Sequence, residues 1–425
     1  MSTKTKIKKL LFQSVKGMHD LLPDDQPLWE RLRKAARDIA ESYNFQRIDT
    51  PLLEKAELFE RSIGETTDVV EKQMFMIKAK DKERLALRPE GTASIARAYI
   101  EYGLSHWPQP VKLYYFGPMY RHERPQEGRF RQFYQVGFEI LGGDPDPIYD
   151  AQSILICFRF LEEMKLNKLA IQVNTIGCKN CRPPYRKKLI DYYKNKSVCN
   201  DCKKRLTVNP LRLLDCKEKE CQEIKKDAPI LLDLICNVCS QHFKQVLEYL
   251  DELKLPYTLN NYLVRGLDYY NRSVFEIYYE GFDDAIASGG RYDYLLEMIG
   301  GRAAPGVGGA VGLERVLLMI KKNEVTFTSR PKNKVFFVHI GDIAKKKSLT
   351  IIEELRKSGV AVEESLGKDS LKAQLRTADK EGVPLALIFG QKEVFENEII
   401  IRDLKTGAQE SVLLAKLVEE LKKRL

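Results

Sequence analysis

The chain has 425 residues, of which 44% are hydrophobic and 31% are charged. This composition excludes a disordered chain, and no run of about 18 apolar residues is present that could span a membrane. The 70 basic and 60 acidic residues give a formal net charge of +10, which fits a polyanionic partner and equally a basic protein without one.

The start of the chain is basic. Residues 1–9 carry four lysines and no apolar segment, so we interpret them as a basic tail and not as a signal peptide. Without such a signal, we expect a cytoplasmic protein whose nine cysteines remain reduced, as thiols or as metal ligands.

The next part of the chain alternates between helical and strand patterns. Apolar residues recur at helical spacing over 24–43, and an extended segment follows over 45–53. Residues 92–102 are predicted to form a second helix. Residues 111–120 and 130–141 are predicted to be central strands joined by a charged loop.

Residues 174–259 interrupt this alternation. They are rich in Lys, Arg, Asn and Cys and mostly helical in pattern, so we interpret them as an insertion. Strand signals return over 264–279, and a glycine-rich stretch leads into a predicted helix over 313–320. We therefore expect one domain over residues 10–325 that contains the insertion.

The C-terminal part is predicted to be a separate small α/β domain over 334–425, after a linker at 326–333. Strand and helix patterns alternate there and end with a hairpin and a terminal helix. The predicted strands are 335–338, 360–362, 385–389 and the hairpin 399–414, and the predicted helices are 348–357 and 370–380.

The charged loop and its strands hold the densest chemistry. The strand at 130–141 alternates strictly, with apolar residues on one face and Gln135 and Glu139 on the other. The strand before it is predicted to carry Arg121 and Glu123 on one face. Buried charges are costly without partners, so either internal salt bridges or a binding site is expected here.

Arginine is concentrated around this loop, at Arg88, Arg121, Arg129 and Arg131. The guanidinium group binds phosphate with two parallel hydrogen bonds and does not lose its proton. The sequence contains neither of the glycine-rich phosphate-binding fingerprints. We therefore expect a polyphosphate to be held by side chains on a sheet.

Three segments resemble the motifs of class II aminoacyl-tRNA synthetases. Residues 116–125 (Phe-Gly-Pro-Met-Tyr-Arg-His-Glu-Arg-Pro) with 131–133 (Arg-Gln-Phe) resemble motif 2. Residues 308–315 (Gly-Gly-Ala-Val-Gly-Leu-Glu-Arg) resemble motif 3, and 50–52 (Thr-Pro-Leu) resemble motif 1, the dimer-forming element. Their order and spacing make the resemblance specific.

Further segments resemble the histidyl-tRNA synthetase family: 263–270, 287–293 and the opening 15–23. The resemblance covers essentially the whole chain. It implies an α/β (α+β) fold, with an antiparallel-sheet catalytic domain, a helical insertion and an α/β anticodon-binding domain. It also implies a homodimer that activates L-histidine with ATP and Mg²⁺ to histidyl-adenylate and pyrophosphate, then transfers histidine to the 3′ end of tRNA(His).

The resemblance also implies the roles of individual residues. The catalytic guanidiniums would be Arg121, Arg265 and Arg315. The contacts to histidine would be Glu90, Gly91, Thr92, Arg121, Gln135, Glu139, Arg265, Tyr269 and Tyr270, and those to ATP would be Arg121, Glu123, Arg129 and Arg315.

The imidazole ring has two nitrogens, and a selective pocket must engage both. The carboxylate of Glu139 can accept from one N–H, and the phenol of Tyr270 can serve the other. The alternative is that Tyr269 and Tyr270 are ordinary core aromatics and that 289–290 is a simple turn.

Eight of the nine cysteines lie between positions 178 and 239. Two Cys-x-x-Cys pairs, separated by 17 residues, have a spacing typical of zinc ribbons, and two further pairs follow at 216/221 and 236/239. We predict a structural zinc on Cys178, Cys181, Cys199 and Cys202, with paired free thiols as the alternative.

Residues 181–205 contain nine Lys or Arg residues and two Asp residues. We predict that they form a patch that neutralises the tRNA backbone; a solvated basic helix face is the alternative. Two other functions are also considered: a histidine-sensing regulatory paralogue from histidine biosynthesis, and a sister class II synthetase for another amino acid.

Overall fold

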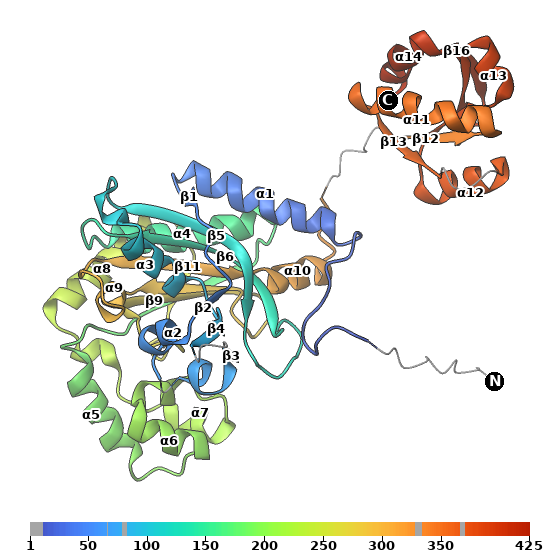
Figure 1. Cartoon of the computed structure of the whole chain (residues 1–425). Helices are drawn as coiled ribbons and strands as arrows, with labels where there is room; N and C mark the ends of the chain where they lie inside the picture. Colours follow the sequence, from blue (N-terminus) through green and yellow to red (C-terminus); the bar gives the residue numbers. More distant parts are fainter. Residues whose placement is uncertain (1–11, 66, 79–82, 328–333, 366–369) are drawn as a thin grey trace, which may run out of the picture. The chain divides into compact units, whose positions relative to one another are not determined.

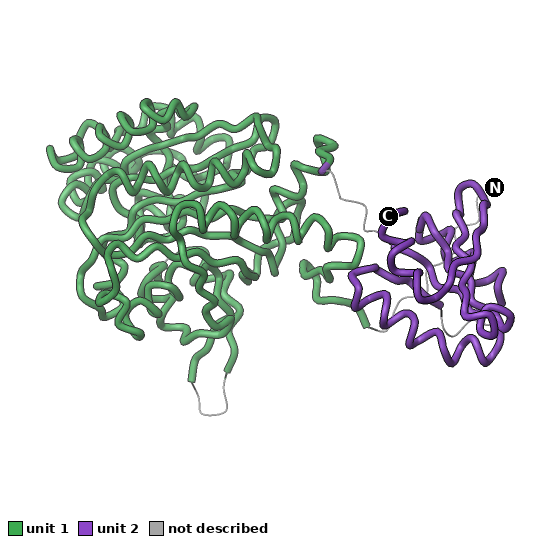
Figure 2. Tube along the Cα trace, turned by 90° about the horizontal axis from the view of Figure 1, so that it is seen from above, with its two compact units in different colours: residues 1–326 green, residues 327–425 purple. Residues whose placement is uncertain are grey.

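The computed structural model describes residues 12–65, 67–78, 83–327, 334–365 and 370–425. They form two compact units, Met1–Thr326 and Phe327–Leu425 (Figures 1 and 2). The predicted basic tail and most of the predicted linker lie outside the described residues. No helix in the described residues has the length and apolar character needed to cross a membrane.

An eight-stranded sheet forms the centre of the first unit (Figure 1). Its order is β1-β5-β6-β11-β10-β9-β7-β8, and all neighbours pair antiparallel except the two outermost pairs. The predicted antiparallel sheet is therefore confirmed. The strands are Gln46–Arg47 (β1), Val111–Tyr120 (β5), Gln132–Leu141 (β6), Leu169–Thr175 (β7), Tyr257–Leu259 (β8), Asn271–Tyr279 (β9), Ala287–Arg291 (β10) and Gly306–Gly312 (β11).

Glycines allow the sheet to pack closely at its centre. A Cβ on Gly289 in β10 would lie 2.2 Å from the carbonyl oxygen of Gly308 in β11. A Cβ on Gly137 in β6 would lie 2.2 Å from the ring of Tyr115 in β5. Real Cβ atoms do not approach this closely, so the glycine-rich stretch is a packing requirement of the sheet and not a flexible loop.

Helices cover the sheet on the side of α4 (Ile148–Glu163), which packs on β6, β10 and β11. The helix α1 (Gln26–Ser42) packs on α4 and β5 and buries Trp29, Leu32 and Ala36 at the predicted helical spacing. Outside the insertion, the other α-helices in the described part of this unit are Ala56–Ile63 (α2), Thr92–Glu101 (α3), Leu295–Met298 (α9) and Leu313–Lys322 (α10). A small sheet, β2-β4-β3, was not expected; its strands are Leu53–Lys55, Arg84–Leu87 and Phe75–Lys78.

The insertion region is mainly helical, and α5, α6 and α7 gather at one end of the unit (Figure 1). It leaves the sheet after β7 and returns to it at β8, so both ends of the predicted range 174–259 belong to strands. Its elements are Arg182–Tyr193 (α5), Asn200–Val208 (α6), the 3₁₀ helix Pro210–Asp215 (η3), Lys219–Lys225 (α7), the 3₁₀ helix Leu231–Leu234 (η4) and Asn237–Glu252 (α8).

One predicted strand is longer than the strand in the structure, and two residues expected on the strand at 111–120 lie outside it. Of the range 264–279 only β9 is a strand, because the backbone N–H of Asp268 donates to the carbonyl of Ile63 (2.9 Å) and not to the sheet. Arg121 and Glu123 lie beyond the end of β5, in the loop. In both cases, predicted site residues lie in loops beyond the ends of the strands and not within the sheet.

The second unit is an α/β fold with the sheet order β13-β12-β14-β15-β16. Its strands are Lys334–His339 (β12), Ala361–Glu364 (β13), Leu385–Phe389 (β14), Glu398–Asp403 (β15) and Gln409–Leu413 (β16). Its helices are Asp342–Lys357 (α11), Leu371–Glu381 (α12), Gln391–Glu396 (α13) and Leu417–Arg424 (α14). The sequence did not predict α13, because six residues are too short to show helical periodicity.

Candidate active site

A cavity of about 500 Å³ lies in the first unit, within the size range of small-molecule sites. Its walls come from segments far apart in the sequence. Among its lining residues are these predicted site residues: Glu90, Thr92, Arg121, Glu123, Arg129, Gln135, Arg265, Tyr269, Tyr270 and Arg315. Gly91 and Glu139 are not in the lining.

One end of the cavity carries two guanidiniums that share the carboxylate of Asp284. Arg129 donates to both of its oxygens, with Nε–Oδ2 at 3.1 Å and Nη2–Oδ1 at 2.6 Å. Nη2 of Arg315 lies 3.8 Å from Oδ2. Burial alone would raise the pKa of Asp284, but the hydrogen bond from Arg129 and the charge of Arg315 outweigh it and lower that pKa to about 2. Asp284 therefore stays ionised and holds the two guanidinium groups in place.

Arg315 stands at the start of α10, and its neighbour fixes that helix to the sheet. The carboxyl of Glu314 accepts the backbone N–H of Tyr134 at 2.8 and 2.9 Å. Burial raises the pKa of Glu314 to about 7. Arg315 itself donates through Nε to the carbonyl of Gly128 (3.1 Å), in the loop between β5 and β6. These contacts join the segments that resemble motifs 2 and 3.

The other two arginines enter from different walls. Arg265 donates to Glu276 and to Oγ of Ser288 (2.8 Å), and its guanidinium lies 5.6 Å from the ring centre of Tyr270. Arg121 donates through Nε to the carbonyl of Pro89 (2.9 Å). The protein therefore orients both guanidinium groups before a ligand binds, so less conformational entropy is lost on binding.

Another part of the cavity wall is acidic and aromatic. Glu90 accepts the backbone N–H groups of Thr92 (2.6 Å) and Ala93 (2.8 Å) at the start of α3. Burial raises the pKa of Glu90, and the two backbone hydrogen bonds oppose that effect. The rings of Tyr269 and Tyr270 are 4.6 Å apart between centres, and the hydroxyl of Tyr269 lies 3.3 Å from Glu90.

Gln135 on β6 supplies a second polar acceptor. Its Oε1 is buried and has no hydrogen-bond partner among the described residues. Buried polar atoms are normally satisfied, so an unsatisfied acceptor in a cavity wall indicates a position that a ligand donor fills.

Glu139 does not contact the cavity directly in this structure. Its side chain is 1% exposed and accepts from Oγ1 of Thr92 (2.8 Å) and from the hydroxyl of Tyr292. Burial raises its pKa to about 8. The predicted contact of Glu139 with a ligand ring stays a prediction; in this structure Thr92 and Tyr292 each donate one hydrogen bond to its carboxyl group. Gly91 is covered as well, since a Cβ there would lie 2.5 Å from the ring of Tyr115.

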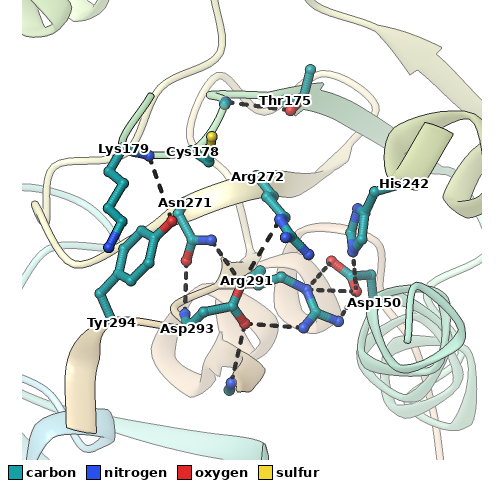
Figure 3. A network of polar contacts seen from close by, with 12 residues as sticks. Asp150, Thr175, Cys178, Lys179, His242, Asn271, Arg272, Arg291, Asp293 and Tyr294 are labelled. Carbon is teal, nitrogen blue, oxygen red and sulfur yellow. Dashed lines mark hydrogen bonds and ion pairs between the residues drawn. The ribbon is translucent and has the colours of Figure 1, made fainter. Parts of the chain in front are cut away.

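The charged side chains of the segment 287–293 form a scaffold and do not line the cavity. Arg291 is 1% exposed and lies between Asp150 and Asp293, as Figure 3 shows. Its Nε is 3.0 Å from Oδ2 of Asp150, and its Nη1 is 3.1 Å from Oδ1 of Asp293. This ion pair connects α4 to the end of β10.

Several lining residues were not predicted. Asp284 and Glu276 hold the cavity arginines, and Asp215 and Lys217 reach the lining from the insertion. None of them stands in a periodic or motif-like position, so the sequence offered no signal for them. Ser288 lies within a segment that resembles a family signature, but its contact with Arg265 was not expected.

The four cysteines predicted to share one zinc are not together. The structure places Cys178 and Cys181 in one group with Cys236 and Cys239, and Cys199 and Cys202 in another with Cys216 and Cys221. The prediction of one four-cysteine site is therefore wrong. The first two pairs do not meet because α5 lies between them in the chain, while the start of α8 returns to the start of α5.

The basic segment 181–205 is only partly available for a partner. Arg182 donates to the carbonyl of Tyr270, and Nη2 of Arg205 lies 3.2 Å from Asp68. Both are thus internal contacts. The remaining basic side chains are exposed: Arg186, Lys187, Lys188, Lys194, Lys196, Lys203 and Lys204.

Among the described residues, five arginines line the cavity; four of them were predicted from the sequence, and Arg212 is the fifth. This cavity, presented by an antiparallel sheet and the helix that follows its central strand, defines a class II aminoacyl-tRNA synthetase. The comparisons with known proteins identify the family. The model for Histidyl-tRNA synthetase matches residues 17–316, and the model for an Anticodon binding domain matches residues 334–424. The chain belongs to the histidyl-tRNA synthetase family.

Relatives match over nearly their full length. Histidine–tRNA ligase of Dehalococcoides mccartyi (strain ATCC BAA-2266) is 42% identical over 419 residues, which cover 98% of this chain and 100% of the relative. The ligase of Desulfitobacterium hafniense (strain DSM 10664) is 43% identical over 98% of this chain and 99% of its own. The crystal structure of apo histidyl-tRNA synthetase from S. aureus has a TM-score of 0.80 at 30% identity, covering 97% of this chain and 100% of that one.

Proposed function

We propose that the cavity binds ATP and L-histidine side by side and forms histidyl-adenylate, and that the enzyme then charges tRNA(His). The single observation that carries the proposal is the convergence of Arg121, Arg129, Arg265 and Arg315 on one cavity that ends in an acidic and aromatic wall. Binding of a polyphosphate requires the arginines, and selective binding of an amino acid with a polar ring requires the acidic and aromatic wall.

The chemistry requires no protein nucleophile. The histidine carboxylate is ionised at neutral pH and attacks the α-phosphorus of ATP, and pyrophosphate leaves. The work of the protein is to position both reactants and to stabilise the charge that develops on the reacting phosphate. Arg121 and Arg265 lie nearer the amino-acid end and are assigned to the reacting phosphate, whereas Arg129 and Arg315 with Asp284 are assigned to the nucleotide.

The acidic wall is suited to the α-ammonium group of histidine. Glu90 and the unsatisfied Oε1 of Gln135 are the acceptors assigned to it. The imidazole ring is assigned to the Tyr269–Tyr270 pair. Glu139 accepts hydrogen bonds from Thr92 and Tyr292 and so positions these two side chains. Such a wall disfavours apolar rings, since its polar groups would be left unpaired.

Mg²⁺ is assigned to the outer phosphates of ATP. Glu123 and Asp283 line the cavity with the carboxylate oxygens that Mg²⁺ prefers, so the residues fit the ion; both oxygens of Asp284 already accept from Arg129. When bound, Mg²⁺ neutralises charge on the departing pyrophosphate. Any structural zinc would belong to the cysteines of the insertion and not to this chemistry.

A homodimer is proposed through the segment that resembles motif 1. Leu52 and Leu53 there are 40% and 39% exposed, and Met76 and Ile77 of the neighbouring small sheet are 45% and 41% exposed. Apolar side chains gathered in this way are typical of protein–protein interfaces.

The acceptor strand of the tRNA is expected to approach the active site alongside the insertion. A second cavity of about 730 Å³ shares Arg265 and Tyr270 with the first, and Lys179, Arg186 and Lys187 also line it. Basic groups next to the reacting end suit the backbone of the acceptor strand. The second unit, which matches the anticodon-binding family, is assigned to the anticodon.

The proposal is tested by charging a tRNA(His) transcript with histidine, with reversal of two exposed lysines as the informative variant. Lys187→Glu with Lys188→Glu is expected to raise the apparent Kd for tRNA about 10-fold and to reduce its salt slope by about 1–2, because phosphate contacts are lost. Lys168→Glu, an exposed lysine before β7, is the matched control. Histidine-dependent exchange without tRNA should be unchanged in both variants.

No charging by the parent protein would reject the proposed function. Normal charging with an unchanged salt slope in the double variant would reject only the role of the patch. The regulatory paralogue and a sister synthetase are not retained, because the family model for Histidyl-tRNA synthetase and the anticodon-binding model both match this chain.

A further inference from the structure

Eight cysteines of the insertion region gather into two separate groups of four. The first group is Cys178, Cys181, Cys236 and Cys239, and the second is Cys199, Cys202, Cys216 and Cys221. We propose that each group binds one Zn²⁺ through four thiolates, so that the chain carries two structural zinc sites. This inference does not depend on the proposed reaction.

The spacing of the sulfurs carries the proposal. With a Zn–S bond of about 2.3 Å, the sulfurs at the corners of a tetrahedron lie about 3.8 Å apart. In the first group Cys178 lies 3.6 Å from Cys181 and 4.0 Å from Cys236, sulfur to sulfur. In the second group Cys199 lies 3.8 Å from Cys216. Within each group all four sulfurs lie within 4.8 Å of one another.

Backbone N–H groups are directed at the sulfurs, as they are around metal-bound thiolates. The N–H of Cys236 lies 3.2 Å from the sulfur of Cys181, and that of Cys199 lies 3.4 Å from the sulfur of Cys221. Gly177 lets the chain approach the first group: it has φ +62°, and a Cβ there would lie 2.6 Å from the Cβ of Cys181. The local backbone is therefore shaped around both groups.

Other occupants fit less well. Bonded disulfide sulfurs are about 2.05 Å apart, much closer than any of these pairs. A [4Fe–4S] cluster binds each cysteine to a different iron and so holds the sulfurs farther apart than one ion does. Four thiolates in a tetrahedron favour zinc or a single iron, and a site closed by four protein ligands is structural and not catalytic.

The two sites would fix different parts of the insertion. The first joins the start of α5 to the start of α8, where the insertion leaves and re-enters the body of the unit. Beside it, Tyr294 contacts the backbone of Lys179 and so connects this group to the network of Figure 3. The first zinc would therefore anchor the insertion to the sheet.

The second site would fix the wall of the catalytic cavity. Cys216 stands between Asp215 and Lys217, which both line that cavity, and Nζ of Lys217 lies 3.3 Å from Asp284. Cys199 caps α6 and Cys221 lies in α7, so one ion would hold two helices and this wall together. Metal binding of this kind supplies folding free energy to a small lobe.

The test is elemental analysis of the full-length protein, purified without added metal or chelator. We expect two zinc ions per chain, one for each group. Cys178→Ser with Cys181→Ser, and separately Cys199→Ser with Cys202→Ser, should each remove one ion. Cys157→Ser is the matched control, because Cys157 is buried on α4 outside both groups and should leave two ions bound.

A second measurement uses the unmodified protein, in case a variant fails to fold. Titration of the thiols with a mercurial, followed by a zinc-sensitive dye, should release two zinc ions per chain. Replacement of zinc by Co²⁺ should give the intense visible bands of tetrahedral thiolate coordination. One zinc or none per chain, or iron in place of zinc, would overturn the proposal.

Discussion

Replacing Arg265 with alanine is expected to lower the rate of histidine-dependent ATP–pyrophosphate exchange by about 10²–10³-fold. The guanidinium is oriented by Glu276 and Ser288 and lies next to Tyr270 in the cavity. It is assigned to the reacting phosphate, where negative charge grows in the transition state. Its loss should therefore lower kcat and kcat/KM together.

Two controls separate this role from general damage. Arg159→Ala removes an exposed guanidinium from α4, 2.9 Å from Glu162, and should leave exchange within two-fold of the parent. Arg265→Lys keeps the charge but not the planar fork, so it should recover only part of the rate. Exchange by Arg265→Ala within a few-fold of the parent would refute the assignment.

The second large effect is expected on stability, at Arg291. Replacement of Arg291 with methionine should lower the free energy of unfolding by about 3–5 kcal/mol, because the buried carboxylate of Asp150 would lose its guanidinium partner. Asp293 is only half-buried and keeps its hydrogen bond from Asn271. Both tryptophans of the chain, Trp29 and Trp107, lie in the first unit, so urea unfolding followed by their fluorescence reports on that unit.

A second substitution, at Asp150, tests whether the loss of stability comes from the unpaired carboxylate. Adding Asp150→Asn to Arg291→Met should restore part of the stability, since the most deeply buried unpaired carboxylate is then neutral. Arg159→Met removes an exposed pair and should cost less than about 1 kcal/mol. A loss of that small size in Arg291→Met would contradict the scaffold role.

The sequence predicted those parts of the fold that depend on local periodicity. The apolar content of 111–120 and the alternation along 130–141 were enough to place β5 and β6, although β6 is buried on both faces from Val136 to Leu141. The charged side chains of the loop were predicted to converge because motif resemblance supplied a fold in which they do. Nothing local showed that the chain over 264–268 bonds to α2 and not to the sheet.

Tertiary contacts account for what the sequence did not predict. The hydrogen bonds from Thr92 and Tyr292 to Glu139 join residues 47 and 153 positions apart in the chain, beyond the reach of any local pattern. Asp284 is recognisable as an anchor only once Arg129 and Arg315 are seen on it. The cysteine spacing indicated metal binding, but the fold of α5 to α8 decides which pairs meet.

The central claim is that four guanidiniums and an imidazole-binding wall make one activation site. It is tested most directly by ATP–pyrophosphate exchange with each of the twenty amino acids in turn. The account predicts exchange with histidine at least about 10³-fold faster, as kcat/KM, than with any other amino acid, because the buried polar wall rejects rings that cannot pair with it. Comparable exchange with a different amino acid, or none with histidine, would contradict it.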